Sequence, residues 1–249
     1  MATSMPQESI CSLVKDGTLE LQTEAGSEPD YYGVVVTEDK LLVIDYDARN
    51  LHLYRRLDGK LMSSHKLESR PMDVCLISKT EVAVCLDDSR IVILSLKSID
   101  DVKRVKTFNV KTGFYKCDSV AKWNSDKLVV SGVKWDDGWM LYWCVVNLTD
   151  GRVDSTHKVC KMGFSSDSHL AIKHDTIYIS CWNSYSTVEG VYAYDILNPH
   201  TPKFLYQHYR FKPNSIMVDE RNFIYVCGSN SIHQLTDSGQ LVTIHTVST

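Results

Sequence analysis

The sequence contains no apolar run near the roughly 20 residues that a membrane-spanning helix needs. Its first residues, MATSMPQESI, lack the basic start and the apolar core of a secretory signal. The cysteines include no CxxC pair, and most lie inside apolar runs such as those around Cys75, Cys85 and Cys227. We therefore predict a cytoplasmic protein without membrane association, whose thiols pack as small hydrophobic side chains, without a disulfide framework or a zinc site.

An excess of charge of one sign is also missing. The 27 Lys and Arg residues nearly balance the 31 Asp and Glu residues, which leaves a formal net charge of −4 at pH 7. Proteins dedicated to nucleic acids usually carry a basic excess, so the composition argues against that class. The sequence contains no GxSxG, no glycine-rich phosphate loop and no HExxH. We therefore predict a protein that is not an enzyme and that needs no cofactor.

A repeated pattern of short β-type runs is what the sequence does contain. Five runs rich in Val, Ile, Leu or Tyr start at residues 41, 81, 127, 176 and 223, and are therefore 40, 46, 49 and 47 residues apart. A similar run precedes each of them across a polar turn, and a third run follows. A closing hairpin that begins with Asp-Gly or Ser-Gly aligns without gaps at 58–67, 150–159 and 238–247.

Four strands in a period of 40 to 49 residues are typical of the blades of a β-propeller. No longer segment shows an apolar stripe at helical spacing. We therefore predict an all-β fold, a single β-propeller over residues 9–249 that follows a disordered tail at 1–8. Residues 10–23 resemble only the closing hairpin of a unit. Two arrangements stay open: five blades with an added N-terminal hairpin, or six blades of which the last is incomplete.

The last repeat carries a family resemblance. Its proline-led strand at 212–219, the strand FIYVCG at 223–228 and the run SIHQL at 231–235 resemble an NHL repeat, and residues 32–54 are similar, with Asp45 where that family often has Asp. The chain therefore resembles NHL-repeat propellers, particularly the C-terminal propellers of tripartite-motif-like proteins. The Asn-His-Arg trio of the repeat and the zinc modules of those proteins are absent from this sequence. The resemblance implies a non-catalytic scaffold that presents a loop face to a protein partner.

The candidate partner-binding residues lie in two aromatic connections. In a propeller, the connections from the second to the third strand emerge on the same face of every blade. Residues 133–139 and 182–190 are long connections of this type and hold three of the five tryptophans. Trp and Tyr are typical contact anchors because they bury a large area and lose little entropy. We therefore predict a binding face made of Trp135, Asp136, Asp137, Trp139, Trp182, Tyr185 and Arg90.

Two further patterns support alternative functions. A basic stripe that includes Lys103, Arg104 and Lys106 fits contact with single-stranded RNA, which some NHL propellers bind. Where the innermost strands begin, Asp73 and Asp118 are candidates for a calcium site of the kind that six-bladed hydrolases use. A protein partner is the leading prediction, RNA binding is the first alternative, and calcium-dependent hydrolysis is the second. The sequence does not predict the oligomeric state.

Overall fold

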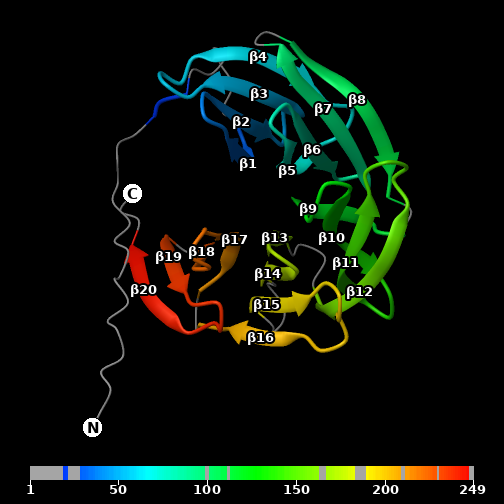
Figure 1. Ribbon diagram of the computed structural model, residues 1–249, viewed down its shortest axis with the longest axis vertical. Helices are drawn as coiled ribbons and strands as arrows, with labels where there is room; N and C mark the ends of the chain where they lie inside the picture. Colours follow the sequence, from blue (N-terminus) through cyan, green and yellow to red (C-terminus); the bar gives the residue numbers. More distant parts are fainter. Residues whose placement is uncertain are drawn as a thin grey trace.

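The computed structural model describes residues 19–21, 29–98, 101–110, 113–162, 167–182, 189–208, 211–228 and 230–246. These residues form 20 strands in five four-stranded antiparallel sheets. Figure 1 shows the sheets arranged as blades around a central axis. The described residues include no helix long and apolar enough to span a bilayer. The prediction of an all-β propeller with five four-stranded repeats is confirmed.

Each blade runs in chain order from an innermost to an outermost strand. Blade 1 contains β1 (Tyr31–Val36), β2 (Lys40–Asp45), β3 (Asn50–Arg55) and β4 (Leu61–Lys66). Blade 2 contains β5 (Pro71–Ser78), β6 (Glu81–Leu86), β7 (Arg90–Ser98) and β8 (Asp101–Asn109). Blade 3 contains β9 (Lys116–Lys122), β10 (Lys127–Trp135), β11 (Trp139–Asn147) and β12 (Val153–Lys161). Blade 4 contains β13 (Asp167–Lys173), β14 (Thr176–Trp182), β15 (Gly190–Asp195) and β16 (Lys203–Tyr206), and blade 5 contains β17 (Pro213–Val218), β18 (Ile224–Gly228), β19 (Ser231–Leu235) and β20 (Leu241–Thr246).

The hydrophobic core lies in layers between neighbouring blades. The second strand of a blade is covered on both faces, so it is a continuous apolar run, as in Val82–Leu86, where every side chain is buried. The outermost strand β12 instead alternates between half-buried and exposed positions. The described cysteines are free thiols, as predicted, and burial raises the pKa of Cys85 and Cys117.

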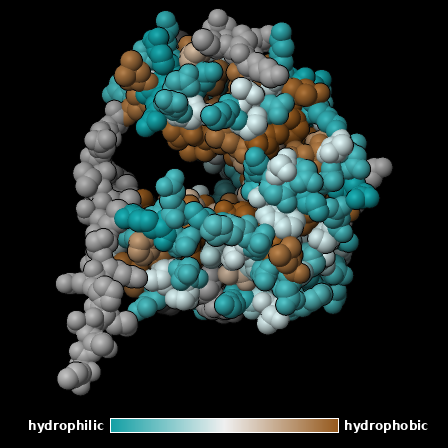
Figure 2. Space-filling model, in the orientation of Figure 1, coloured by the Kyte–Doolittle hydropathy of each residue, from teal (hydrophilic) through white to brown (hydrophobic). Residues whose placement is uncertain are grey.

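The described residues leave a gap in the ring between blade 5 and blade 1 (Figure 1). Four apolar clusters fill the spaces between successive blades, and none of the clusters formed by described residues joins blade 5 to blade 1. Figure 2 shows the hollow on this side of the molecule, with apolar residues along it. Val34 and Val36 on β1 are 59% and 53% exposed, and Met217 on β17 is 55% exposed. The innermost strands that border the opening therefore present apolar side chains to solvent.

The segment Leu19–Leu21 lies against the outer part of blade 1. A Cβ added to Gly59, in the turn between β3 and β4, would lie 2.1 Å from the carbonyl oxygen of Glu20. The equivalent turn of blade 3 holds Gly151, whose added Cβ would lie 2.5 Å from Phe108 of β8, the outermost strand of blade 2. Relative to blade 1, Leu19–Leu21 therefore takes the place of the outermost strand of a preceding blade. The rest of the hairpin expected at 10–23, and the tail at 1–8, lie outside the described residues.

We expect Gly59→Ala to destabilise the protein more than Gly113→Ala. Both glycines have a positive φ, 66° and 72°, so each substitution carries a strain of about 1 kcal/mol or more. Only at Gly59 would the new methyl group meet a backbone carbonyl, because the nearest atom at Gly113 is Cε of Lys134, at 3.7 Å. Urea unfolding of the two variants measures the difference. Equal losses would show that Glu20 does not pack against this turn in solution.

Candidate binding face

The predicted long loop at 133–139 is instead a tight turn, and this corrects the expectation from the sequence. The pairing of β10 with β11 continues to Trp135 and Trp139, which leaves only residues 136–138 as the connection. Val133 and Leu141 are buried partners near this end, so continued strand pairing keeps them out of water. Asp137 and Gly138 close the turn with φ values of 52° and 117°.

Trp135 and Trp139 form an exposed aromatic cluster with Tyr115. The two indole rings meet edge to face with centroids 5.4 Å apart, and the Tyr115 ring lies 5.1 Å from that of Trp139. Trp135 is 64% exposed and Tyr115 is 59% exposed. The strand pairing and the ring contacts hold these side chains in place, so a partner would meet them with little further loss of entropy.

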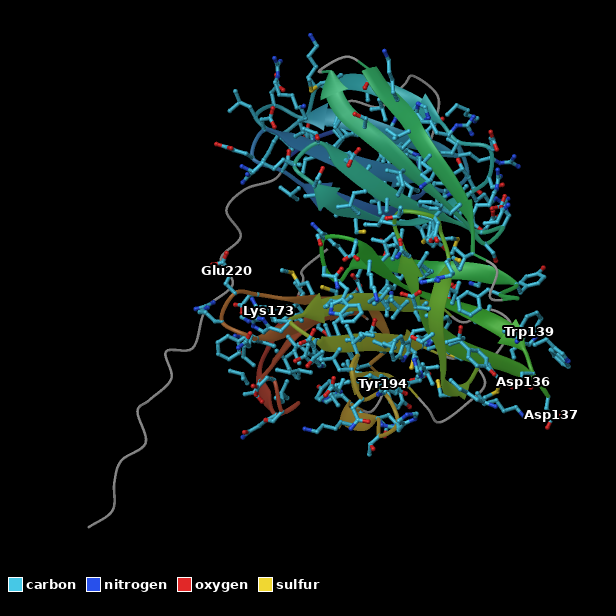
Figure 3. All side chains as sticks on the ribbon, turned by 45° about the vertical axis from the view of Figure 1, so that its right-hand side comes forward. Asp136, Asp137, Trp139, Lys173, Tyr194 and Glu220 are labelled. Carbon is cyan, nitrogen blue, oxygen red and sulfur yellow. The ribbon has the colours of Figure 1, made fainter. Side chains whose placement is uncertain are left out.

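The two acidic residues of this turn lie beside the cluster. The Tyr142 hydroxyl donates a 2.6 Å hydrogen bond to Asp136, and Nζ of Lys158 lies 3.5 Å from the same carboxylate. This hydrogen bond, followed by the charge of Lys158, holds the pKa of Asp136 below its usual range. Asp137 is exposed. Figure 3 shows Asp136, Asp137 and Trp139 together at one end of the propeller, away from Lys173 and Glu220.

The remaining predicted contact residues have different surroundings. Trp182 ends β14 in blade 4, and the ammonium group of Lys212 lies 4.8 Å from the centre of its ring. Tyr185 lies outside the described residues. Arg90 pairs with Asp88 at 2.6 Å and also with Glu68, so its charge is already matched within the protein. Hydrogen bonds to these two carboxylates raise the pKa of Arg90.

Tyrosines that the sequence reasoning missed line a cavity of about 560 Å³ at this end of the propeller. Tyr32 lies on β1, Tyr46 follows β2, and Tyr115 precedes β9. A neighbouring cavity of about 370 Å³ shares Tyr32 and includes Trp182. The sequence signal for these residues is that aromatic side chains stand at or next to strand ends in blades 1 and 3, outside the connections 133–139 and 182–190. We call the following set the aromatic face: Tyr32, Tyr46, Tyr115, Trp135, Trp139 and Trp182.

Near the axis, Asp73 and Asp118 tie innermost strands together. The backbone N–H of Val120 donates a 3.1 Å hydrogen bond to Asp73. The hydroxyl of Ser168 donates a 3.2 Å hydrogen bond to Asp118, and Nζ of Lys116 lies 3.1 Å from that carboxylate. Burial raises the pKa of Asp73 and raises that of Asp118 to about 6. In the described part of the chain, no group of three or more His, Cys, Asp or Glu side chains could hold a metal ion.

These residues therefore do not fit the calcium site that the sequence left open. Both carboxylates already accept hydrogen bonds from neighbouring strands, and the nearest charged partner of Asp118 is a lysine rather than further acids. A calcium ion needs six to eight oxygen ligands, which two carboxylates engaged in this way do not supply.

The basic stripe lies on β8, the outermost strand of blade 2, where Lys103, Arg104 and Lys106 are exposed. Arg104 pairs with the Glu68 carboxylate. Lys106 donates a hydrogen bond to the Thr149 carbonyl and lies 4.5 Å from the centre of the Phe108 ring. Arg104 and Lys106 thus contact neighbours at the rim of the ring.

No protein-family model matches the sequence, and no curated protein matches it. Solved structures do resemble the chain. The β-propeller domain of Cps50 (Swd1) from Myceliophteria thermophila has a TM-score of 0.62 at 10% identity, over 86% of this chain and 73% of that one. The WD40 propeller domain of Doa1 has a TM-score of 0.59 at 15% identity, over 80% and 60%. The gluconolactonase XC5397 from Xanthomonas campestris has a TM-score of 0.66 at 11% identity, over 88% and 76%.

These similarities establish the fold alone. The chain spans between 60% and 76% of the length of solved structures that it matches. The names of those proteins include both propeller domains and an enzyme, and one fold supports many functions. The chain is therefore a five-bladed β-propeller, similar in fold to solved propellers that include a WD40 domain.

Proposed function

We propose that this protein is a non-catalytic interaction scaffold that binds a protein partner through the aromatic face. The observation that carries the proposal is the run of ring contacts from Tyr115 through the half-buried Trp139 to Trp135, in which Tyr115 and Trp135 are exposed at one end of the propeller. Exposed aromatic groups of this kind are typical of interaction sites. We also propose that the propeller is of the NHL type found in tripartite-motif-like proteins, on the sequence pattern of its first and last repeats.

The architecture suits this role. Blades 1, 3 and 4 each contribute at least one ring to the same end of the propeller. The sheets hold these side chains at constant separations, so a partner would bind several anchors at once without ordering flexible loops. A WD40 propeller domain among the structural relatives supports a scaffold role, because WD40 propellers commonly bind proteins.

Replacing Trp135 and Trp139 together with alanine is expected to abolish capture of the partner. Central aromatic anchors contribute about 2 kcal/mol or more each to binding, so capture should fall at least about 30-fold. The measurement is affinity purification from cells with quantitative mass spectrometry. Trp123→Ala is the matched control, because this half-buried tryptophan of blade 3 lies before β10, at the opposite end of that strand.

The melting temperature of the double variant should stay within a few degrees of the wild-type value. If the double variant retains every partner of the wild-type protein, the aromatic face is not the binding surface. RNA crosslinking that requires Lys103, Arg104 and Lys106, with unchanged protein partners, would instead support the RNA alternative.

A further inference from the structure

The 560 Å³ cavity at the aromatic face has room for a complete side chain of a partner. Its wall comes from strand ends and connections of blades 1, 2 and 3, together with Asp167 at the start of β13 in blade 4. Tyr32, Tyr46 and Tyr115 supply aromatic wall, while Asp87 and Lys116 supply charge.

Two of the three tyrosine rings are open to a ligand. Tyr46 is enclosed, since the Tyr32 ring stacks on it at 4.7 Å and the Arg70 guanidinium lies 4.9 Å from its centre. Tyr32 itself is 40% exposed, and Tyr115 is 59% exposed. The electron-rich faces of such rings attract cations, and the attraction strengthens when water is displaced. The pair of Tyr46 and Arg70 shows the same type of contact within this cavity.

Each of the two cations in the cavity wall forms an ion pair with at least one carboxylate, whereas one carboxylate of the wall has no ion pair with a described residue. Nζ of Lys116 lies 2.9 Å from Asp167 and 3.1 Å from Asp118. The guanidinium of Arg70 lies 3.8 Å from the carboxylate of Asp47. The wall of the cavity contains the carboxylates of Asp87, Asp88 and Asp167 against the two cations Arg70 and Lys116.

Asp87 is the carboxylate of the wall for which no ion pair is found among the described residues. Its neighbour Asp88 pairs with Arg90 at 2.6 Å. No lysine or arginine among the described residues lies within ion-pair distance of Asp87. Burial raises the pKa of Asp87 and the charge of Asp88 raises it further, while a backbone hydrogen bond from Arg70 and the charges of Arg70 and Arg49 oppose the rise only in part. A positive group placed beside Asp87 would therefore relieve both the desolvation of this carboxylate and its repulsion from Asp88.

We infer that this cavity binds the side chain of an arginine or lysine of the protein partner, with the cation beside Asp87 and against the rings of Tyr32 and Tyr115. This inference rests on the proposed function, because it names what the aromatic face would recognise. The surrounding Trp135 and Trp139 would then contact apolar residues next to the basic one. A guanidinium or an ammonium group is the ligand that meets both the aromatic wall and the unmatched carboxylate.

The test is titration of the isotope-labelled protein with the pentapeptide Gly-Gly-Arg-Gly-Gly, capped at both ends and followed by NMR. Saturable shifts are expected at the amides near Asp87 and Tyr115. The same peptide with citrulline, which is neutral and of similar shape, should bind at least about 10-fold more weakly. Asp87→Asn should weaken binding of the arginine peptide about 10-fold, the effect of losing one charge-assisted hydrogen bond.

Glu220→Gln is the matched control for overall charge. It removes one exposed carboxylate at the other end of the propeller, outside the cavity, and should leave the affinity within about two-fold. Tyr115→Ala provides a second variant and should also weaken binding. Equal affinity for the arginine and citrulline peptides, equal effects of Asp87→Asn and Glu220→Gln, or an absence of saturable binding would overturn the inference. The tryptophan experiment would still stand in that case, because it reads partner capture and not binding of this peptide.

Discussion

Replacing Trp143 with alanine is expected to lower the free energy of unfolding by about 3 to 5 kcal/mol, the usual cost of removing a large buried aromatic side chain. Trp143 lies on β11 and is fully buried between blades 3 and 4. Its ring packs 4.3 Å from that of His157 and 5.9 Å from that of Tyr194, which comes from the next blade. The side chain thus joins two sheets that have no backbone hydrogen bonds to each other.

Urea unfolding followed by circular dichroism measures this loss of stability. The variant Trp143→Phe provides a more conservative comparison at the same position. The indole N–H of Trp143 is buried without a hydrogen-bond partner among the described residues, so phenylalanine should lose volume but no hydrogen bond. We expect the phenylalanine variant to lose clearly less stability than the alanine variant. A loss below about 1 kcal/mol for Trp143→Ala would mean that blades 3 and 4 do not pack as described.

A rise in pH from about 4 to about 6 is expected to destabilise the wild-type protein relative to Asp118→Asn. Burial raises the pKa of Asp118 from 3.8 to about 6, an effect that Lys116 opposes and Asp167 reinforces. Between these two values the folded protein keeps a proton on Asp118 that the unfolded chain has lost. Stability then falls with rising pH, because the folded state binds more protons. The difference of about two pKa units corresponds to roughly 3 kcal/mol.

Unfolding of both proteins at several pH values from 4 to 7 measures this difference. Asparagine does not titrate, so the stability of the variant relative to wild type should increase through this range and level off above it. Asp73 also has a raised pKa, but it is present in both proteins and its effect cancels. Parallel stability curves would show that Asp118 titrates in the folded protein as it does in the unfolded chain.

The order of the strands was predictable because it depends on local patterns. Apolar runs such as Val82–Leu86 and turn dipeptides such as Asp58-Gly59 specify strands and hairpins from neighbours in the chain. The same reasoning failed at residues 133–139. An aromatic and charged stretch was interpreted as a long loop, whereas pairing of Val133 with Leu141 extends the hairpin almost to its tip.

The candidate site was predictable only in part. Trp135 and Trp139 were found because the face of a second-to-third-strand connection follows from propeller topology. The matching of Arg90 with Glu68 and Asp88, and of Arg104 with Glu68, was not visible, because Glu68 belongs to the connection between blades 1 and 2. Charge counts along a sequence do not show which cations are already paired.

The sequence by itself determined the all-β class, the repeat of four strands and the placement of two tryptophans at one end of the ring. These follow from periodicity and turn chemistry, which act between residues close together in the chain. Only the tertiary structure decided that no apolar cluster of the described residues joins blades 5 and 1, that three tyrosines line one cavity, and that Asp87 forms no ion pair with a described residue. The physical reason is that side-chain contacts between blades join residues far apart in the sequence, and packing and desolvation at those contacts leave no local pattern.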